Sequence, residues 1–137
     1  MARLVLNLHG KTSDARMADI IEDYSKRLKS NLRIEYHSSK LSDSEYVSKL
    51  PANTILLDEG GDLINSIEFS ERFRKWQLSS EDINLAIGPA NGFPKELPNQ
   101  RISLSKLTFP HELATVVLVE QIYRASEILR GTPYHRT

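Results

Sequence analysis

The pattern of hydrophobic and polar positions divides the chain into five short apolar runs and four amphipathic segments. The apolar runs have strand length and end at Gly, Pro or polar residues, so they predict β-strands; they cover residues 3–8, 32–37, 53–58, 82–87 and 101–104. Residues 13–28, 42–50, 66–76 and 110–130 carry apolar side chains at helical spacing and predict α-helices.

Residues typical of helix ends support these boundaries. Thr12 or Ser13 can cap the first helix, and Ser42 can cap the second. Pro110 fits the first position of the last helix, and Gly131 can end it. Residues 62–65, between the third strand and the third helix, are expected to form a loop.

The order of the elements indicates the fold class. Strands and helices alternate until the fourth strand, after which a long loop leads to the fifth strand and the last helix. This order predicts an α/β fold, a mostly parallel sheet with helices on both faces. A length of 137 residues is expected for one domain, covering residues 1–137.

The last predicted helix is apolar on more than one side. Leu113, Leu118 and Ile122 lie on one side, while Val116 and Tyr123 extend the apolar surface to a second. One sheet face would not cover such a helix. A subunit interface is one explanation, and a central position in the core of a monomer is the other.

Composition excludes several classes of protein. The chain has 39% apolar and 26% charged residues and a net charge of zero, so its bulk electrostatics do not indicate a nucleic-acid binder. It has no cysteine, no long apolar run and no N-terminal pattern of a secretory signal, which together predict a cytoplasmic protein without a membrane span. The four histidines have no metal-ligand spacing, so we expect no metal site.

Three segments follow strands whose carboxyl ends should meet at one edge of the sheet, where α/β proteins bind ligands. They are residues 57–61, 88–93 and 104–109. Their backbone groups could bind an adenine edge or a ribose, while the absence of Gly-x-Gly-x-x-Gly and of a P-loop argues against a nucleoside triphosphate site. Gly88 and Gly92 could let the backbone approach a ligand closely or adopt a positive φ, or they could only make turns. Asp58 and Glu59 are either an acid–base or metal-binding pair, or solvated acids bonded to a loop N–H.

The C-terminal tail is rich in polar side chains with chemical uses. His135 can move a proton, Arg136 can hold a phosphate with two hydrogen bonds, and Tyr134 can stack on a base. Such a trio suits an RNA substrate, and a frayed polar terminus is the alternative. Arg124 lies four residues after Glu120 on the last helix, and the two are expected to pair.

Several motifs together resemble one family. Residues 103–111 read SLSKLTFPH, residues 119–125 read VEQIYRA, and residues 129–136 read LRGTPYHR. Leu57-Asp58-Glu59, Ile87-Gly88 and Gly10-Lys11 add shorter matches upstream. This set, which spans nearly the whole chain, resembles the RlmH family of ribosomal RNA methyltransferases, and the C-terminal motif is its most specific part.

The resemblance implies a fold and a function. Members of that family are homodimers of the SPOUT class with a C-terminal trefoil knot, and they transfer a methyl group from S-adenosylmethionine to N3 of a pseudouridine in 23S rRNA of the large ribosomal subunit. The implied methyl-donor site consists of Leu57, Gly88, Leu104, Ser105, Lys106, Leu107, Thr108 and Phe109. The implied catalytic residues are Tyr134, His135 and Arg136, facing the substrate across the dimer interface, with Arg124 and Arg136 as RNA contacts.

Two features depart from the family pattern. Pro89 stands where the family usually has a second glycine, and the chain is shorter than most bacterial members around residues 38–52. The alternative function is therefore a catalytically inactive module of the same fold that binds RNA or the ribosome. An unrelated α/β hydrolase would need a Gly-x-Ser-x-Gly elbow, which this sequence lacks.

Overall fold

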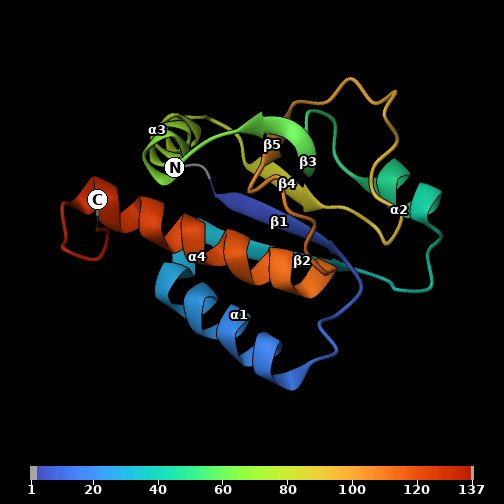
Figure 1. The fold of residues 1–137 in the computed structure, drawn as a ribbon, viewed down its shortest axis with the longest axis horizontal. Coiled ribbons are helices and arrows are strands. Elements are labelled where there is room, and N and C mark those ends of the chain that lie inside the picture. Colours follow the sequence, from blue (N-terminus) through green and yellow to red (C-terminus); the bar gives the residue numbers. More distant parts are fainter. Residues whose placement is uncertain (1–2, 137) are drawn as a thin grey trace.

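The computed structural model describes residues 3–136 and contains the predicted α/β fold (Figure 1). The elements are β1 (Leu4–His9), α1 (Ala15–Leu28), β2 (Leu32–His37), α2 (Asp43–Lys49), β3 (Ile55–Leu63), α3 (Ser66–Gln77), β4 (Ile83–Ile87), β5 (Arg101–Ser103) and α4 (His111–Arg130). The strands form one sheet in the order β2-β1-β4-β3-β5, and all recorded strand pairs are parallel.

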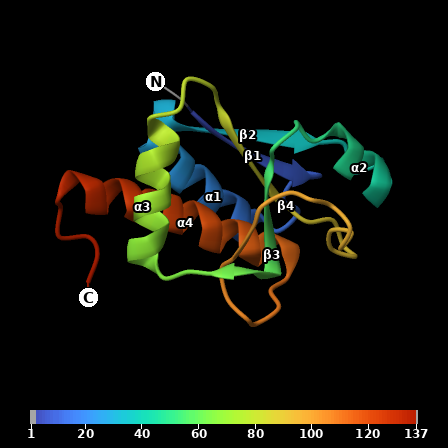
Figure 2. The same ribbon diagram turned by 90° about the horizontal axis from the view of Figure 1, so that it is seen from above.

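The two faces of the sheet are covered unequally. Alternate residues along each strand point to opposite faces, and in β4 Leu85 and Ile87 join the main core while Ala86 joins a smaller one. Helices α1, α3 and α4 cover the main core, with α4 in contact with both of the others (Figures 1 and 2). Helix α2 and the segment 88–100 cover the smaller core around Tyr46 and Phe93. The prediction of helices on both faces is confirmed, but only α2 lies on the second face.

The first helix begins differently from the prediction. Asp14 caps α1, and its carboxylate accepts hydrogen bonds from the N–H groups of Arg16 and Met17. The proposed caps, Thr12 and Ser13, are therefore wrong. Ser13 is used elsewhere, because its hydroxyl donates to the carboxylate of Glu112 on α4 at 2.7 Å. The capping box that Ser42 forms at the start of α2 confirms the second predicted cap.

The ends of α4 are set by Pro110 and Gly131. Pro110 was expected inside the helix, but its ψ of 148° is extended and α4 begins at His111. Pro110 lies just before the first turn of the helix. Because proline has no backbone N–H, this residue needs no acceptor there. At the other end Gly131 has a φ of 73°, and its N–H and that of the next residue donate to the carbonyls of Ile128 and Glu127, both at 3.1 Å. This Schellman arrangement confirms the predicted helix end.

Strand β3 is longer than predicted. It continues to Leu63 instead of ending at residue 58, so the first two residues of the loop expected at residues 62–65 are strand and only residues 64 and 65 are loop. The pairing of β3 with β5 shifts register between Leu57 and Asp62, as at a β-bulge. A Cβ added to Gly61 would lie 2.6 Å from the backbone carbon of Arg101. Gly60 and Gly61 therefore lie at a bulge where β3 and β5 approach each other closely. The sequence pattern had instead predicted that the strand ends before these glycines.

A polar cluster lies at the carboxyl ends of β1 and β4, beneath α2. The buried Tyr46 hydroxyl contacts the carbonyls of Asn7 and Ile87 at 3.0 and 2.8 Å. The His37 ring Nε2 lies 2.9 Å from Oδ1 of Asn7, whose amide nitrogen donates to the carbonyl of Leu85. Because Asn7 Oδ1 can only accept, Nε2 of His37 is the donor. Burial lowers the pKa of His37.

The lowered pKa of His37 predicts a loss of stability in mild acid. The unfolded chain takes up a proton near the ordinary histidine pKa of about 6.5, and the folded chain does so only at lower pH. The melting temperature should therefore be highest above pH 7 and fall as the pH drops below about 6.5. A His37→Gln variant, which keeps a donor group, should show a shallower decrease between pH 7 and 5. Equal slopes in the two proteins would contradict this assignment.

Over residues 3–136, no helix is long and apolar enough to cross a membrane.

Candidate functional site

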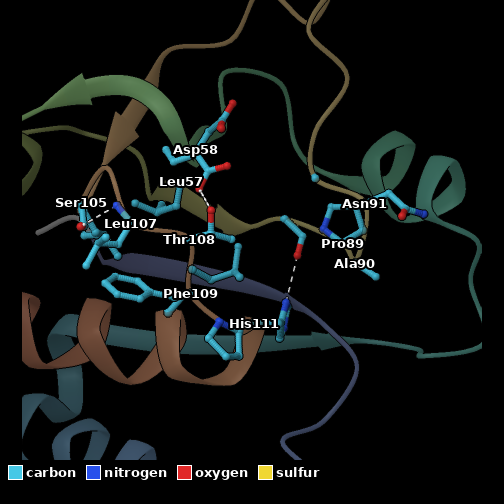
Figure 3. Close-up of a pocket in the computed structure, with 17 residues that line it drawn as sticks. Leu57, Asp58, Pro89, Ala90, Asn91, Ser105, Leu107, Thr108, Phe109 and His111 are labelled. Atoms are coloured by element: carbon cyan, nitrogen blue, oxygen red, sulfur yellow. Dashed lines mark hydrogen bonds between the residues drawn. The ribbon is translucent and has the colours of Figure 1, made fainter.

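The three segments expected to meet at the carboxyl edge of the sheet do meet, around a cavity of about 610 Å³ (Figure 3). This volume is within the range of about 300–1,000 Å³ typical of small-molecule sites. The cavity is lined by Leu57, Asp58, Glu59, Ile87, Gly88, Pro89, Ala90, Asn91, Gly92, Leu104, Ser105, Leu107, Thr108, Phe109, Pro110, His111 and Ala114. The convergence predicted from the topology is therefore confirmed.

The lining includes all of the expected donor-site residues except Lys106. The side chain of Lys106 is exposed, and the residue does not line the cavity. The first turn of α4, which was not predicted to take part in the site, contributes His111 and Ala114 to the wall. The sequence feature that could have indicated this part of the wall is His111, a histidine directly after the proline at the start of a helix.

The loop after β4 is held from both sides. Nδ1 of His111 lies 2.9 Å from the carbonyl of Gly88, and because a carbonyl only accepts, this nitrogen carries the proton. The Tyr46 hydroxyl holds the preceding carbonyl, that of Ile87. On the outer side, the amide of Asn91 donates to Asp43 on α2 at 3.0 Å. The backbone that borders the cavity is thus fixed before any ligand binds.

Pro89 is accommodated within a tight turn. Its carbonyl accepts a hydrogen bond from the N–H of Gly92 at 2.8 Å, and Gly92 has a φ of 76°. A Cβ added to Gly88 would lie 3.3 Å from the ring of Phe93. Gly88 therefore permits close packing and Gly92 a left-handed conformation. The prediction of a turn at these glycines is confirmed, and the same turn forms part of the cavity wall. A close approach of its backbone to a ligand stays a prediction.

The two acids after Leu57 do different things. Asp58 forms an ion pair with Arg101, and its carboxylate also accepts from the N–H of Gly60 at 3.2 Å. Glu59 accepts from the hydroxyl of Thr108 at 2.6 Å, which joins β3 to the loop before α4. The alternative of an acid bonded to a nearby loop N–H is confirmed for Asp58. Within residues 3–136 no three His, Asp or Glu side chains are grouped so that they could hold a metal ion.

The C-terminal tail folds back on the second half of α4. The hydroxyl of Tyr134 donates to Glu120 at 2.8 Å and contacts that of Tyr24 at 3.3 Å, and its ring packs edge-on against Tyr123. Burial, followed by the hydrogen bonds to Tyr24 and Glu120, raises the pKa of Tyr134, so this phenol stays protonated at neutral pH. Tyr134 is therefore a tail anchor within its own chain.

Arg124 joins the same cluster. It pairs with Glu120 at 2.8 Å, as predicted, and lies over the ring of Tyr134 at 5.0 Å. Its Nη1 is 3.1 Å from Nδ1 of His135. Since an arginine only donates, Nδ1 of His135 is the acceptor and the proton of the neutral ring lies on Nε2. Arg136 is exposed.

The tail and the cavity lie at opposite ends of α4 (Figures 1 and 2). His111 at the cavity begins the helix, and the tail follows its last residue, Arg130. Tyr134 and His135 contact Glu120 and Arg124, so about 14 and 20 Å of helix separate these contacts from His111 at the cavity. None of the described tail residues lines the cavity of the same chain.

Comparison with known proteins agrees with these features. A family model described as "Predicted SPOUT methyltransferase" matches residues 2–135. The chain belongs to this family.

Relatives within the family cover the chain almost completely. The protein named "Ribosomal RNA large subunit methyltransferase H" from Protochlamydia amoebophila (strain UWE25) is 40% identical over 141 residues, which cover 99% of this chain and 100% of the relative. The protein of the same name from Parasynechococcus marenigrum (strain WH8102) is 42% identical, covering 93% and 92%. The resemblance to the RlmH family is therefore confirmed.

A solved structure extends the comparison to the fold. The crystal structure of TrmJ from Z. mobilis ZM4 has a TM-score of 0.53 to this SPOUT family member, with 6% sequence identity, and the match covers 91% of this chain and 70% of that chain. At this identity the similarity concerns the fold alone.

Proposed function

We propose that the protein transfers a methyl group from S-adenosylmethionine to N3 of a pseudouridine in 23S rRNA of the large ribosomal subunit. The observation that carries this proposal is full-length similarity, at 40% identity, to a relative named as a large-subunit rRNA methyltransferase. It is supported by a nucleoside-sized cavity where the family motifs converge. We place its action in the cytoplasm, where bacterial ribosomes are found.

The cavity suits this donor in chemical terms. Its wall consists mainly of apolar side chains and backbone from three loops, suited to an adenine and a ribose, and it contains no phosphate-binding motif. Leu57, Gly88 and the loop 104–109 would hold the donor, which supplies a methyl group already activated by a sulfonium. The protein then has to align the two reactants, and this positioning is the main catalytic contribution of the protein.

A homodimer would supply what one chain lacks. In each chain the tail is held at Glu120 and Arg124, about 14 to 20 Å along α4 from its start at the cavity, and no described tail residue lines that cavity. We therefore propose that the partner's tail completes the site. Apolar side chains are available for contact with the partner: Leu113 and Val117 on α4 are half-buried, and Leu63 at the end of β3 and Ile67 in α3 are 52% and 44% exposed. A second cavity of about 300 Å³ is lined by Val117 and Phe69, among others, and shares Leu104 with the first.

We also propose the trefoil knot of the SPOUT class for the C-terminal part. Strand β5 lies at the sheet edge beside β3, while the following helix, α4, packs between α1 and α3. The chain therefore crosses from the edge to the middle of the molecule through residues 104–110, beside the segment 88–100. Such a crossing is where a knot would form.

The tail residues have distinct proposed roles. His135 would take part in removing the proton of N3, and Arg136 would stabilise the negative charge that develops on the base carbonyls or bind an RNA phosphate. In the described conformation Nδ1 of His135 is occupied by Arg124. To accept a proton there, His135 must separate from Arg124. An RNA contact of Arg124 stays a prediction. Its contacts in the structure, with Tyr134 and His135, hold the tail in position.

Mapping of methylated nucleotides tests the proposed function. Ribosomal RNA from cells with and without the protein should differ at one pseudouridine in 23S rRNA, and restoring the gene should restore the methyl group. Titration calorimetry with S-adenosylmethionine separates this function from an inactive RNA-binding module, which should give no heat. Unchanged rRNA in the deleted strain would contradict the proposal.

A further inference from the structure

We infer that Glu59 makes the cavity selective for ligand charge, so that the cationic methyl donor binds more tightly than its uncharged product. The inference rests on the proposed function, because it assigns a role in the same cavity. It concerns a residue whose contact described above, the hydrogen bond from Thr108, leaves its negative charge without an assigned role.

The charges on the cavity wall are few. Among the residues that line the cavity, Asp58 and Glu59 are acidic and none is Lys or Arg. Asp58 is neutralised by its ion pair with Arg101. Within residues 3–136, Glu59 has no cationic side chain within 4 Å, and its one side-chain hydrogen bond is from the Thr108 hydroxyl to Oε2. Glu59 therefore contributes a negative charge that no ion pair offsets.

The Glu59 side chain is exposed, and its hydrogen bond with Thr108 restrains it relative to the loop before α4. The 2.6 Å bond to Thr108 ties the end of the Leu57 segment to the loop 104–109, across from the Gly88 turn (Figure 3). A charge held in one place discriminates better than one on a freely rotating side chain, since no ordering is needed when the ligand binds.

The reaction changes the charge of the ligand. S-adenosylmethionine carries a positively charged sulfonium, and loss of the methyl group leaves the neutral thioether of S-adenosylhomocysteine. A carboxylate beside the cavity attracts the former and has no such attraction for the latter. The same residue would thus favour donor loading and product release.

The test compares three ligands of nearly the same shape. Calorimetry on the wild-type protein and on Glu59→Gln would use S-adenosylmethionine, S-adenosylhomocysteine, and sinefungin, in which a protonated amine replaces the methylated sulfur. Gln keeps the size of Glu and an oxygen that can accept from Thr108. We expect Kd to rise roughly three- to tenfold for the two cationic ligands and to change less than about twofold for the thioether. Because the site is partly exposed, the difference should shrink at high salt.

A matched control isolates the position of the charge. Glu96 is exposed on the segment 88–100 and does not line the cavity, so Glu96→Gln should change none of the three Kd values. Equal weakening of all three ligands by Glu59→Gln, or no change in any, overturns the inference while the proposed function stands. If the wild-type protein binds none of the three, the proposed function fails and the inference fails with it.

Discussion

Replacing His135 by Ala should lower the methylation rate by about 10²- to 10⁴-fold, the usual contribution of a proton-transferring side chain. The donor Kd should stay within about twofold of the wild-type value, because the expected donor contacts lie on the three loops and His135 is not among the residues that line the cavity. Single-turnover methylation of rRNA and calorimetry with the donor measure the two quantities. Equal losses of rate and donor affinity would contradict the assignment.

The variant His135→Gln distinguishes two ways in which this histidine could act. Glutamine can donate a hydrogen bond to a base carbonyl, as Nε2–H of the described tautomer can, but it cannot take up a proton. If His135 accepts the proton of N3, Gln should be as inactive as Ala. If it only donates, Gln should recover much of the rate, and the proton acceptor would have to be another group.

A mixture of two inactive subunits tests whether the tail acts on the partner's cavity. One subunit carries His135→Ala, and the other carries Gly88→Val, where even a Cβ would crowd the ring of Phe93 at 3.3 Å. In a mixed dimer one cavity and one tail remain intact, and they face each other only if the tail crosses the interface. Random mixing should then restore roughly a quarter of wild-type activity, since half of the dimers have one working site. If the mixture recovers no methylation activity, the tail does not act on the partner's cavity.

The fold was largely predictable because each element has a local signal. Apolar runs with flanking turn residues located all five strands, and a parallel sheet follows from their alternation with helices. The errors arose where a side chain had a distant partner. Ser13 is an ordinary capping residue, but Glu112, 99 positions along the chain, binds it, and Asp14 caps the helix instead.

The site was predictable in outline for the same reason, and unpredictable in its contacts. Parallel strands bring their carboxyl ends to one edge, so three loops had to be neighbours. The roles of Asp58 and Glu59 depended on Arg101 and Thr108, which are more than 40 residues away. Likewise, local patterning placed the tail after α4 but could not indicate that Tyr134 packs against Tyr24 and Tyr123. Contacts of this kind depend on packing of whole elements and leave no periodic signal.

Replacing Gly61 by Ala should destabilise the protein by about 3 kcal/mol, which corresponds to a decrease of roughly 10 °C in melting temperature for a domain of this size. The added Cβ would lie 2.6 to 2.8 Å from the carbon, oxygen and Cβ of Arg101, closer than real contacts allow. Strand β5 would have to move away from β3, and the loop that follows β5 lines the cavity. Donor affinity should therefore fall together with stability.

The neighbouring glycine provides the matched control for this effect. A Cβ on Gly60 would have the Asp58 carboxylate as its nearest neighbour, at 3.8 Å, which is an ordinary contact. Gly60→Ala should therefore change stability by less than about 1 kcal/mol, and the lower flexibility of the unfolded chain favours a small gain. Thermal unfolding of both variants followed by circular dichroism measures the contrast. Similar melting temperatures for Gly61→Ala and Gly60→Ala would mean that β5 can shift without loss of stability. The close approach of β3 to β5 would then not determine the position of the loop 104–109.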